Sequence, residues 1–238
     1  MSKPPRLISF SGLDGSGKST QIAAAVSLLE SSGLRVRTLT FWDNVVVLTR
    51  FREGFVHKVY GSERGIGAPG KPVQRRDKNV RTWYLSLARH ALYSLDACHL
   101  RWVIARQRSA DVDVVIMDRY LYDELANLPL DSRWSRGWIR LLLHLAPRPD
   151  LALLLDADPE AACARKPEYP LEFMRQCRAW YHRLAQIVGT LTIIPPLPLV
   201  EAKQAVAAAL QRVLGHAEKS GVRSQKTGVR SQKLEVRS

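Results

Sequence analysis

The amino-acid sequence predicts an α/β fold: a central parallel sheet of about five strands with helices on both faces. Short apolar runs alternate with helical patterns along the chain, as in strands joined by crossover helices. The run Val112–Met117 is rich in β-branched residues, which is typical of a strand covered on both faces. The run Arg6–Ser11 leads directly into a glycine-rich turn and then a helical pattern. In such folds, ligands bind beyond the carboxyl ends of the strands.

The remaining strands are predicted from their composition and from the residues that end them. Residues 35–41 alternate between polar and apolar side chains, and residues 151–155 form an apolar run that follows Pro149-Asp150. Pro195-Pro196 end the last run. The predicted strands are Arg6–Ser11, Arg35–Phe41, Val112–Met117, Leu151–Leu155 and Leu191–Ile194.

The segments between these strands have helical periodicity. In the first, Ile22, Val26 and Leu29 fall on one face, and Gly33 supplies a C-terminal cap. The longest pattern has an apolar face formed by Leu85, Ala88, Leu92, Leu95 and Leu100. The predicted helices are Lys18–Ser32, Val80–Arg108, Leu171–Val188 and Val200–Leu214.

The composition describes a globular chain with a basic excess. Its 238 residues are 46% hydrophobic and 24% charged, enough for one domain, which we place at residues 1–216. No run approaches the ~18 apolar residues of a membrane span, so we expect no membrane partner. The three cysteines form no C-x-x-C pair, which favours a reducing cytoplasm over a disulfide or zinc scaffold. The net charge of +14 favours anionic partners.

Two segments carry much of this basic charge outside the predicted elements. Residues 57–80 belong to a stretch rich in Arg, Lys, Gly and Pro with little periodicity, which we interpret as a basic loop insertion. Residues 217–238 contain imperfect copies of one short basic sequence and few apolar residues. Such a tail lacks the apolar surface to offset chain entropy, so we expect it to be disordered.

The strongest motif lies between the first strand and the first helix. Residues 12–19 satisfy G-x-x-x-x-G-K-[ST] in the strand–helix context that this motif requires. A polyphosphate needs several backbone N–H groups pointed inward, in conformations that glycine adopts cheaply. We therefore expect Lys18 to contact the β- and γ-phosphates of a nucleotide and the Ser19 hydroxyl to bind Mg²⁺. The predicted ATP-binding residues of this loop are Gly12, Leu13, Asp14, Gly15, Ser16, Gly17, Lys18, Ser19 and Thr20.

A carboxylate at the end of a later strand supports this assignment. Asp118 follows the apolar run Val114–Met117, where the metal of the phosphate loop would lie. We expect Asp118 to hold Mg²⁺ or its water, with capping of the following turn as the alternative. Arg119 comes directly after it and can donate to a phosphate oxygen.

Three separated segments resemble thymidylate kinases, in the same order as in that family. They are Phe10–Gln21, Asp118-Arg119-Tyr120 and Pro149–Glu160, the last followed by Arg165. The resemblance covers about residues 6–215 and implies a three-layer P-loop kinase fold. It also implies transfer of the γ-phosphoryl of ATP, with Mg²⁺, to a nucleoside monophosphate, dTMP above all. Family members are commonly dimers, so a homodimer is consistent with it.

The resemblance also assigns roles to individual residues. It implies catalytic roles for Lys18, Asp14, Arg119 and Arg165, and it places Asp14 and Arg119 near the acceptor phosphate. It implies a lid over residues 165–171, in which Arg165 and Lys166 contact ATP. Some family members carry an arginine where this chain has Gly15, so the compensating cation is expected from Arg165 or Lys166, with Arg175 more distant.

The acceptor pocket departs from the family pattern. Tyr93 occupies the place of the aromatic residue that stacks on thymine in the family; packing in the hydrophobic core is an equal alternative for this side chain. Ala97 occupies the place of an arginine that binds the base in the family. Residues 41–44 replace a glycine-rich loop of the family. Arg50 and Arg52 are candidates for binding the acceptor phosphate.

Two other functions remain open at this point. One is a P-loop kinase for a different phosphorylated or hydroxyl-bearing small molecule; a neutral hydroxyl would need a carboxylate base, for which Asp43 and Asp123 are the candidates. The other is a non-enzymatic nucleotide- or nucleic-acid-binding module. Aromatic residues are sparse in the basic segments, which disfavours a nucleic-acid partner.

Overall fold

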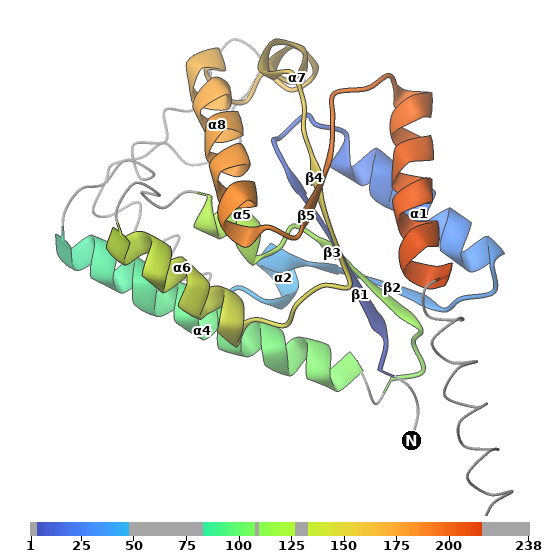
Figure 1. The fold of residues 1–238 in the computed structure, drawn as a ribbon, viewed down its shortest axis with the longest axis horizontal. Helices are drawn as coiled ribbons and strands as arrows, with labels where there is room; N and C mark the ends of the chain where they lie inside the picture. The colour runs from blue at the N-terminus through green and yellow to red at the C-terminus, as the bar shows by residue number, and fades with distance from the viewer. Residues whose placement is uncertain (1–3, 48–82, 108–109, 127–132, 216–238) are drawn as a thin grey trace, which may run out of the picture.

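A five-stranded parallel sheet forms the centre of the molecule (Figure 1). The computed structural model describes residues 4–47, 83–107, 110–126 and 133–215. The strand order is β2-β3-β1-β4-β5, and every neighbouring pair is parallel. The strands are β1 (Arg6–Gly12), β2 (Val36–Thr40), β3 (Val114–Asp118), β4 (Leu151–Leu155) and β5 (Leu191–Ile194). The central strand β1 therefore lies between β3 and β4, and the phosphate-loop motif begins at its carboxyl end.

Helices cover both faces of the sheet. α4, α5, α6 and α8 lie on one side in Figure 1, while α1 and a last described helix over residues 199–215 lie on the other. The helices are α1 (Lys18–Ser31), α2 (Phe41–Asn44), α4 (Trp83–Gln107), α5 (Leu121–Leu125), α6 (Arg133–Leu145), α7 (Pro159–Arg165) and α8 (Leu171–Val188).

The alternation of side chains along the strands divides the core into two halves. Leu7 and Val115 face a cluster that includes Leu100 of α4, Ile139 of α6 and Leu184 of α8. Their neighbours Ile8 and Ile116 point to the opposite face, where Ile22 and Leu29 of α1 pack with Leu210 of the helix 199–215. A doubly covered sheet of this kind fixes the strand register, because a slip by one residue would exchange the two faces.

The three-layer α/β fold and the predicted strands are confirmed within a residue or two at their ends. One assignment in the core was wrong: Leu95, expected on the buried face of the long helix, is 51% exposed. The buried positions of α4 include Tyr93, Asp96, Ala97 and Leu100. Asp96 is completely buried, and its Oδ1 accepts a hydrogen bond from the Val47 N–H at 3.0 Å. Because this buried polar residue interrupts the apolar pattern, the sequence did not indicate which face of α4 is buried.

Several segments were not predicted or cannot be compared. The short helices α2 and α5 and the longer α6 received no assignment from the sequence. The basic loop 57–80, the tail 217–238, Arg50 and Arg52 lie outside the described residues.

Candidate active site

The loop between β1 and α1 leaves backbone donors available for an anion. Within the loop, the Ser16 N–H donates to the Leu13 carbonyl at 3.1 Å, which closes a tight turn. α1 begins at Lys18, and no side chain accepts from its first-turn N–H groups. The Ser16 hydroxyl is buried without a hydrogen-bond partner among the described residues. An uncapped helix N-terminus beside an unsatisfied hydroxyl is suited to bind phosphate oxygens.

Two glycines of the loop adopt left-handed backbone conformations, but for different reasons. Gly15 has φ +80° and Gly17 has φ +86°. A Cβ at Gly15 would lie 2.5 Å from the Ala162 carbonyl oxygen of α7, whereas one at Gly17 would meet nothing within 4 Å. An arginine at position 15, as some thymidylate kinases carry, would collide with the α7 backbone. The departure from the family pattern at Gly15 therefore has a steric cause.

Lys18 is a buried cation folded over the loop. Its ammonium donates to the carbonyls of Gly12 and Leu13 at 2.8 and 2.7 Å, and the residue is 7% exposed. The pKa of Lys18 is lowered to about 8, mainly by burial and also by the charge of Arg119. The carboxylates of Asp123, Asp14 and Asp118 oppose that decrease. Two of the three ammonium protons are used by loop carbonyls, so one donor remains for a phosphate oxygen.

Arg119 and Asp14 form a partly buried pair beside Lys18. The Arg119 guanidinium donates to Asp14 Oδ1, and a second nitrogen lies 3.9 Å from Asp123 Oδ1. Burial disfavours the charge on Arg119, but the carboxylates of Asp123 and Asp14 outweigh it and raise the pKa of the guanidinium. For Asp14, burial is outweighed by Arg119, Lys18 and Lys166, which lower the pKa of its carboxyl. Both side chains are therefore charged at neutral pH.

The predicted magnesium ligands provide hard oxygen donors on two elements. Asp118 ends β3, in register with Phe10 of β1 and Thr40 of β2, and its charge acts on Lys18. Ser19 lies exposed in the first turn of α1. Among the described residues, no group of three or more His, Cys, Asp or Glu side chains could hold a metal by itself. This donor set suits Mg²⁺, which is usually held by one or two protein oxygens together with substrate phosphates and water.

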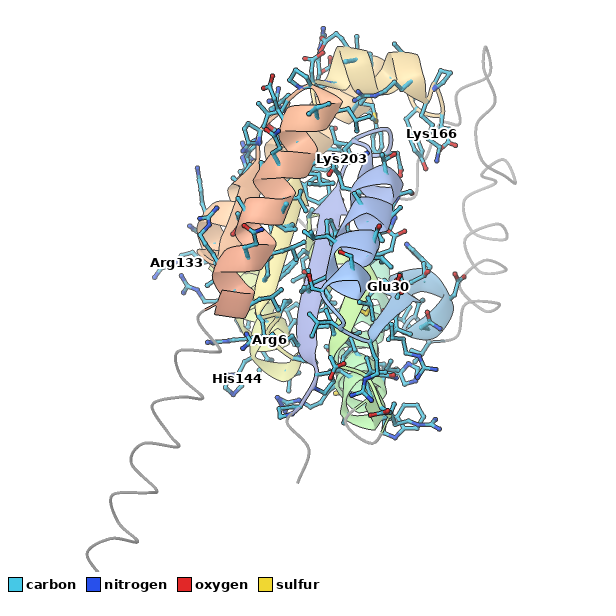
Figure 2. The ribbon with its side chains drawn as sticks, turned by 90° about the vertical axis from the view of Figure 1, so that its right-hand side faces the viewer. Arg6, Glu30, Arg133, His144, Lys166 and Lys203 are labelled. Carbon is cyan, nitrogen blue, oxygen red and sulfur yellow. The ribbon has the colours of Figure 1, made fainter. Side chains whose placement is uncertain are left out.

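The predicted lid connects α7 to α8 at the end of the molecule opposite Arg6 and His144 (Figure 2). Arg165 is the last residue of α7 and is exposed. Lys166 forms an ion pair with Glu168 at 3.1 Å, and its charge acts on Asp14 of the phosphate loop. Because the first strand begins at Arg6, this places the lid at the carboxyl ends of the parallel strands.

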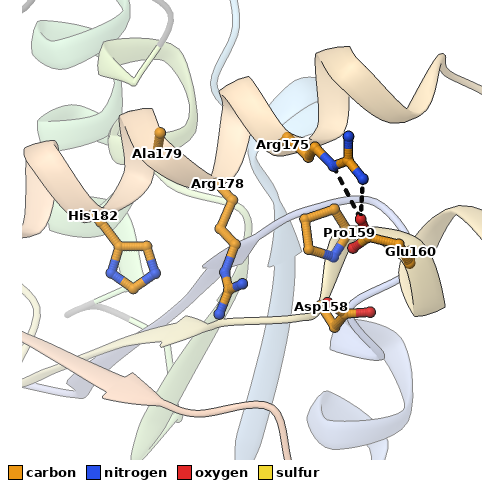
Figure 3. A pocket seen from close by; sticks show the side chains of 7 residues that line it. All are labelled: Asp158, Pro159, Glu160, Arg175, Arg178, Ala179 and His182. Carbon is orange, nitrogen blue, oxygen red and sulfur yellow. Dashed lines mark hydrogen bonds and ion pairs between the residues drawn. The ribbon is translucent and has the colours of Figure 1, made fainter.

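Arg175, the more distant lid candidate, is engaged elsewhere. It donates to Glu160 from its Nε at 3.0 Å and lies 3.6 Å from Glu172 (Figure 3). Arg175 and Glu160 line an open pocket between α7 and α8 that also includes Arg178 and His182. The positive charge of Arg178 is also paired, because its guanidinium makes two hydrogen bonds to Asp156, at 2.8 and 2.7 Å.

On the acceptor side, Tyr93 and Ala97 belong to the core. Tyr93 is 6% exposed and Ala97 is fully buried in the cluster beneath the sheet. A small apolar side chain in that position packs against its neighbours and offers no hydrogen bond to a base.

The two candidate general bases occupy contrasting surroundings. Asp43 is exposed in α2. Asp123 is buried and accepts hydrogen bonds from Ser11, Tyr120 and Tyr181. The oxygens of Asp123 are therefore engaged by donors of the protein itself, and a role of either carboxylate as a base stays a prediction. Sequence reasoning also missed the contacts of Tyr181, which lies in no motif, and of Ser11, which precedes the phosphate-loop motif.

Comparison with known proteins finds thymidylate kinases that align with most of the chain. The chain is 29% identical over 204 residues to the probable thymidylate kinase of Pyrococcus abyssi, covering 80% of this chain and 87% of that protein. It is 29% identical over 226 residues to the thymidylate kinase of Tropheryma whipplei, covering 89% and 95%. A crystal structure of thymidylate kinase from Ehrlichia chaffeensis shares the fold, with a TM-score of 0.56 over 88% of this chain and 99% of that one, at 19% identity.

The chain is similar to thymidylate kinases. No family model matches it. The similarity nevertheless extends over most of the chain; the probable thymidylate kinase of Archaeoglobus fulgidus aligns with 90% of it at 25% identity. In the described part of this thymidylate kinase-like chain, the helices are too short or too polar to span a membrane.

Proposed function

We propose that the protein is an ATP- and Mg²⁺-dependent kinase that transfers the γ-phosphoryl group of ATP to a nucleoside monophosphate, dTMP above all. The observation that carries this proposal is the meeting of Lys18, Asp14 and Arg119 at the open N-terminus of α1. Thymidylate kinases are the relatives that align with most of the chain, which supports dTMP as the acceptor.

In this proposal the residues of the chain bind and align two anionic substrates. The loop N–H groups from residue 13 onward and the Ser16 hydroxyl receive the β- and γ-phosphate oxygens. The ammonium of Lys18 neutralises charge on the transferred group, and Arg165 and Lys166 supply further cations from the lid. Because Gly15 cannot carry a side chain, the loop itself cannot provide such a cation.

The Asp14–Arg119 pair is assigned to the acceptor phosphate. Arg119 donates to Asp14 in the free protein and retains further N–H groups for a phosphate oxygen. The attacking oxygen belongs to a phosphate that is already anionic, so the step needs no strong general base. This fits a site in which the carboxylates pair with cations and in which Asp123 is occupied by other donors.

Ser19 and Asp118 would hold Mg²⁺ between α1 and the end of β3. When bound, the ion would supply positive charge that reduces the repulsion opposing attack on the terminal phosphate. The residues of the chain then keep the two phosphates in line and exclude competing water.

The proposal is tested with the purified full-length chain, ATP and Mg²⁺, and separate incubations with dTMP and the other nucleoside monophosphates. We expect ADP and dTDP to form in equal amounts, and EDTA to abolish the reaction. A folded chain that binds ATP but leaves dTMP and the other pyrimidine monophosphates unphosphorylated would contradict the proposal. Activity restricted to another acceptor would retain the kinase and replace its substrate.

A further inference from the structure

A buried carboxylate beneath the phosphate loop joins three segments that are far apart in the sequence. Asp123, in α5, is 6% exposed. It accepts hydrogen bonds from the Ser11 hydroxyl of β1 at 2.7 Å and from the Tyr181 hydroxyl of α8 at 2.7 Å. α5 and α8 lie on the same face of the sheet in Figure 1. The carboxylate therefore links the end of the central strand to the helix that follows the lid.

The donors are divided between the two oxygens of Asp123. Oδ2 accepts from Ser11 and from the Tyr120 backbone N–H at 2.9 Å. Oδ1 accepts from Tyr181 and, at 3.4 Å, from the Gly12 backbone N–H. A carboxylate offers about four lone-pair sites, and these donors fill them. Asp123 is consequently engaged on both oxygens by donors of the protein itself.

The groups that Asp123 holds are those that begin the two phosphate-binding segments. Gly12 is the first residue of the loop motif, and Tyr120 follows Arg119 directly. Arg119 has φ +66°, a left-handed conformation that costs a non-glycine residue about 1 kcal/mol or more. Its own N–H donates to the Phe10 carbonyl at 2.9 Å, so β1 and Asp123 hold the peptide units on both sides of Arg119.

We propose that Asp123 is a positioning residue: it fixes the first peptide of the phosphate loop and the backbone that carries Arg119, and Tyr181 couples this anchor to α8. The inference rests on the proposed function, because its consequence for turnover requires that Arg119 and the loop bind the two phosphates. It assigns the carboxylate no direct contact with substrate. Loss of the anchor misplaces both phosphates, and a shift of about 1 Å in such sites can lower turnover ~100-fold.

Asp123→Asn is the sharpest test because the two side chains have the same shape. An amide turns one oxygen into an NH₂ group, which then faces the Tyr120 N–H in one orientation and the Gly12 N–H in the other. Hydroxyl groups can rotate away from a new donor, but backbone N–H groups cannot. The substitution therefore strains one of the two phosphate-binding segments in either orientation.

Asp150→Asn provides a matched control at the opposite end of the sheet. The Asp150 carboxylate also accepts from a β1 backbone N–H, that of Leu7 at 2.8 Å, and lies 3.7 Å from Arg6. Like Asp123 it holds a β1 backbone N–H, but its side chain is 43% exposed against 4% for Asp123, and it lies at the amino ends of the strands, away from the loop. A purely structural role would give both variants the same pattern: lower stability with unchanged kcat per folded molecule.

Steady-state kinetics and calorimetry on the full chain decide between these outcomes. For Asp123→Asn we expect kcat to fall ~100-fold and the Kd for ATP–Mg²⁺ to rise ~10-fold, while Asp150→Asn changes neither by more than about twofold. Values for Asp123→Asn within twofold of the unaltered protein would overturn the proposal. Equal losses in both variants would also overturn it.

Two further measurements cover the cases in which the Asp123→Asn variant does not fold or the unaltered chain phosphorylates no acceptor. If Asp123→Asn does not fold, Ser11→Ala and Tyr181→Phe each remove one hydrogen-bond donor to Asp123. We expect kcat to fall ~5-fold or more in each variant, and an unchanged kcat in both would refute the positioning role of Asp123.

If the unaltered chain binds ATP but phosphorylates no acceptor, the proposed function fails, but the positioning role of Asp123 can still be tested by ATP binding. In that case weaker ATP binding by Asp123→Asn supports the positioning role, and equal binding excludes it.

Discussion

Two charge clusters lie along α8, and they differ in burial. The buried cluster, around the phosphate loop, consists of Asp14, Lys18, Arg119, Asp123 and Tyr181. The exposed cluster, at the open pocket between α7 and α8, consists of Glu160, Arg175, Arg178 and His182, together with the less exposed Asp156 that pairs with Arg178 and His182. α8 contributes Tyr181 to the first and Arg175, Arg178 and His182 to the second.

The difference shows how burial decides what a charge contributes. In the buried cluster, burial is the main cause that lowers the pKa of Lys18 to about 8, and the carboxylates oppose it. For Asp14, burial opposes ionisation, but the charges of Arg119, Lys18 and Lys166 outweigh it and lower the pKa. In the exposed cluster, water and salt screen most of each attraction. We therefore expect substitutions in the buried cluster to change activity, and those in the exposed cluster to have small effects on stability alone.

Lys18→Ala is expected to have the largest effect, since it removes the buried cation assigned to the transferred phosphate. We predict a fall in kcat of ~10³-fold. Steady-state kinetics measure it, and Lys203→Ala, which removes an exposed lysine from the helix 199–215, serves as the control. An unchanged kcat in Lys18→Ala would remove Lys18 from the mechanism.

Gly15→Ala tests the close packing of the phosphate loop against α7, and Gly17→Ala is its matched control. Both positions have nearly the same φ, so the backbone strain is the same, but only at Gly15 does a Cβ meet the α7 backbone. We predict a loss in the free energy of unfolding of about 3 kcal/mol for Gly15→Ala and about 1 kcal/mol for Gly17→Ala. Urea denaturation measures both, and equal losses would show that α7 yields without cost.

Arg178→Ala addresses the least exposed pair of the exposed cluster. The Asp156 side chain is 7% exposed and loses two hydrogen bonds in this variant, while the His182 contact at 3.2 Å remains. We predict a loss of about 1 kcal/mol in the free energy of unfolding, with kcat unchanged. A large fall in kcat would mean that the exposed cluster belongs to the active site.

Arg175→Ala should be smaller still, because Arg175 and its partner Glu160 are about half exposed. We expect a thermal midpoint and a kcat indistinguishable from those of the unaltered protein. Differential scanning calorimetry at low and high salt checks this, and a clear destabilisation that disappears in high salt would show that the pair matters.

The smallest effect is expected at an exposed pair far from α8, between Arg35 and Asp113. Hydrogen bonds from the Arg35 side chain and backbone lower the pKa of Asp113 to about 2. A lowered carboxyl pKa contributes stability above the unfolded pKa of about 4, and that contribution is lost as the pH falls towards 2. Arg35→Ala should therefore lower the thermal midpoint slightly at pH 6 and not at pH 2; the same shift at both would contradict this origin.

The phosphate loop could be predicted from the sequence because its information is local. The glycines, Lys18 and Ser19 are neighbours in the chain, and the strand before them is an apolar run. The contacts of Asp123 could not be predicted in this way. They join Ser11, Tyr120 and Tyr181, which come together only when β1, α5 and α8 pack on one another.

The missed elements have similar physical reasons. α2 has too few residues for a periodic pattern. α6 buries only Ser135, Ile139 and Leu142, a narrow stripe among arginines and tryptophans. The error at Leu95 arose because a buried aspartate interrupts the apolar face of α4, and its partner, the Val47 N–H, lies far away in the sequence.

The contact between Gly15 and the Ala162 carbonyl has a consequence for how the site could change by mutation. A single substitution at position 15 cannot place an arginine in this loop, because the backbone of α7 would have to move first. The packing of one short helix on one turn thus excludes a cation from position 15 of the phosphate loop.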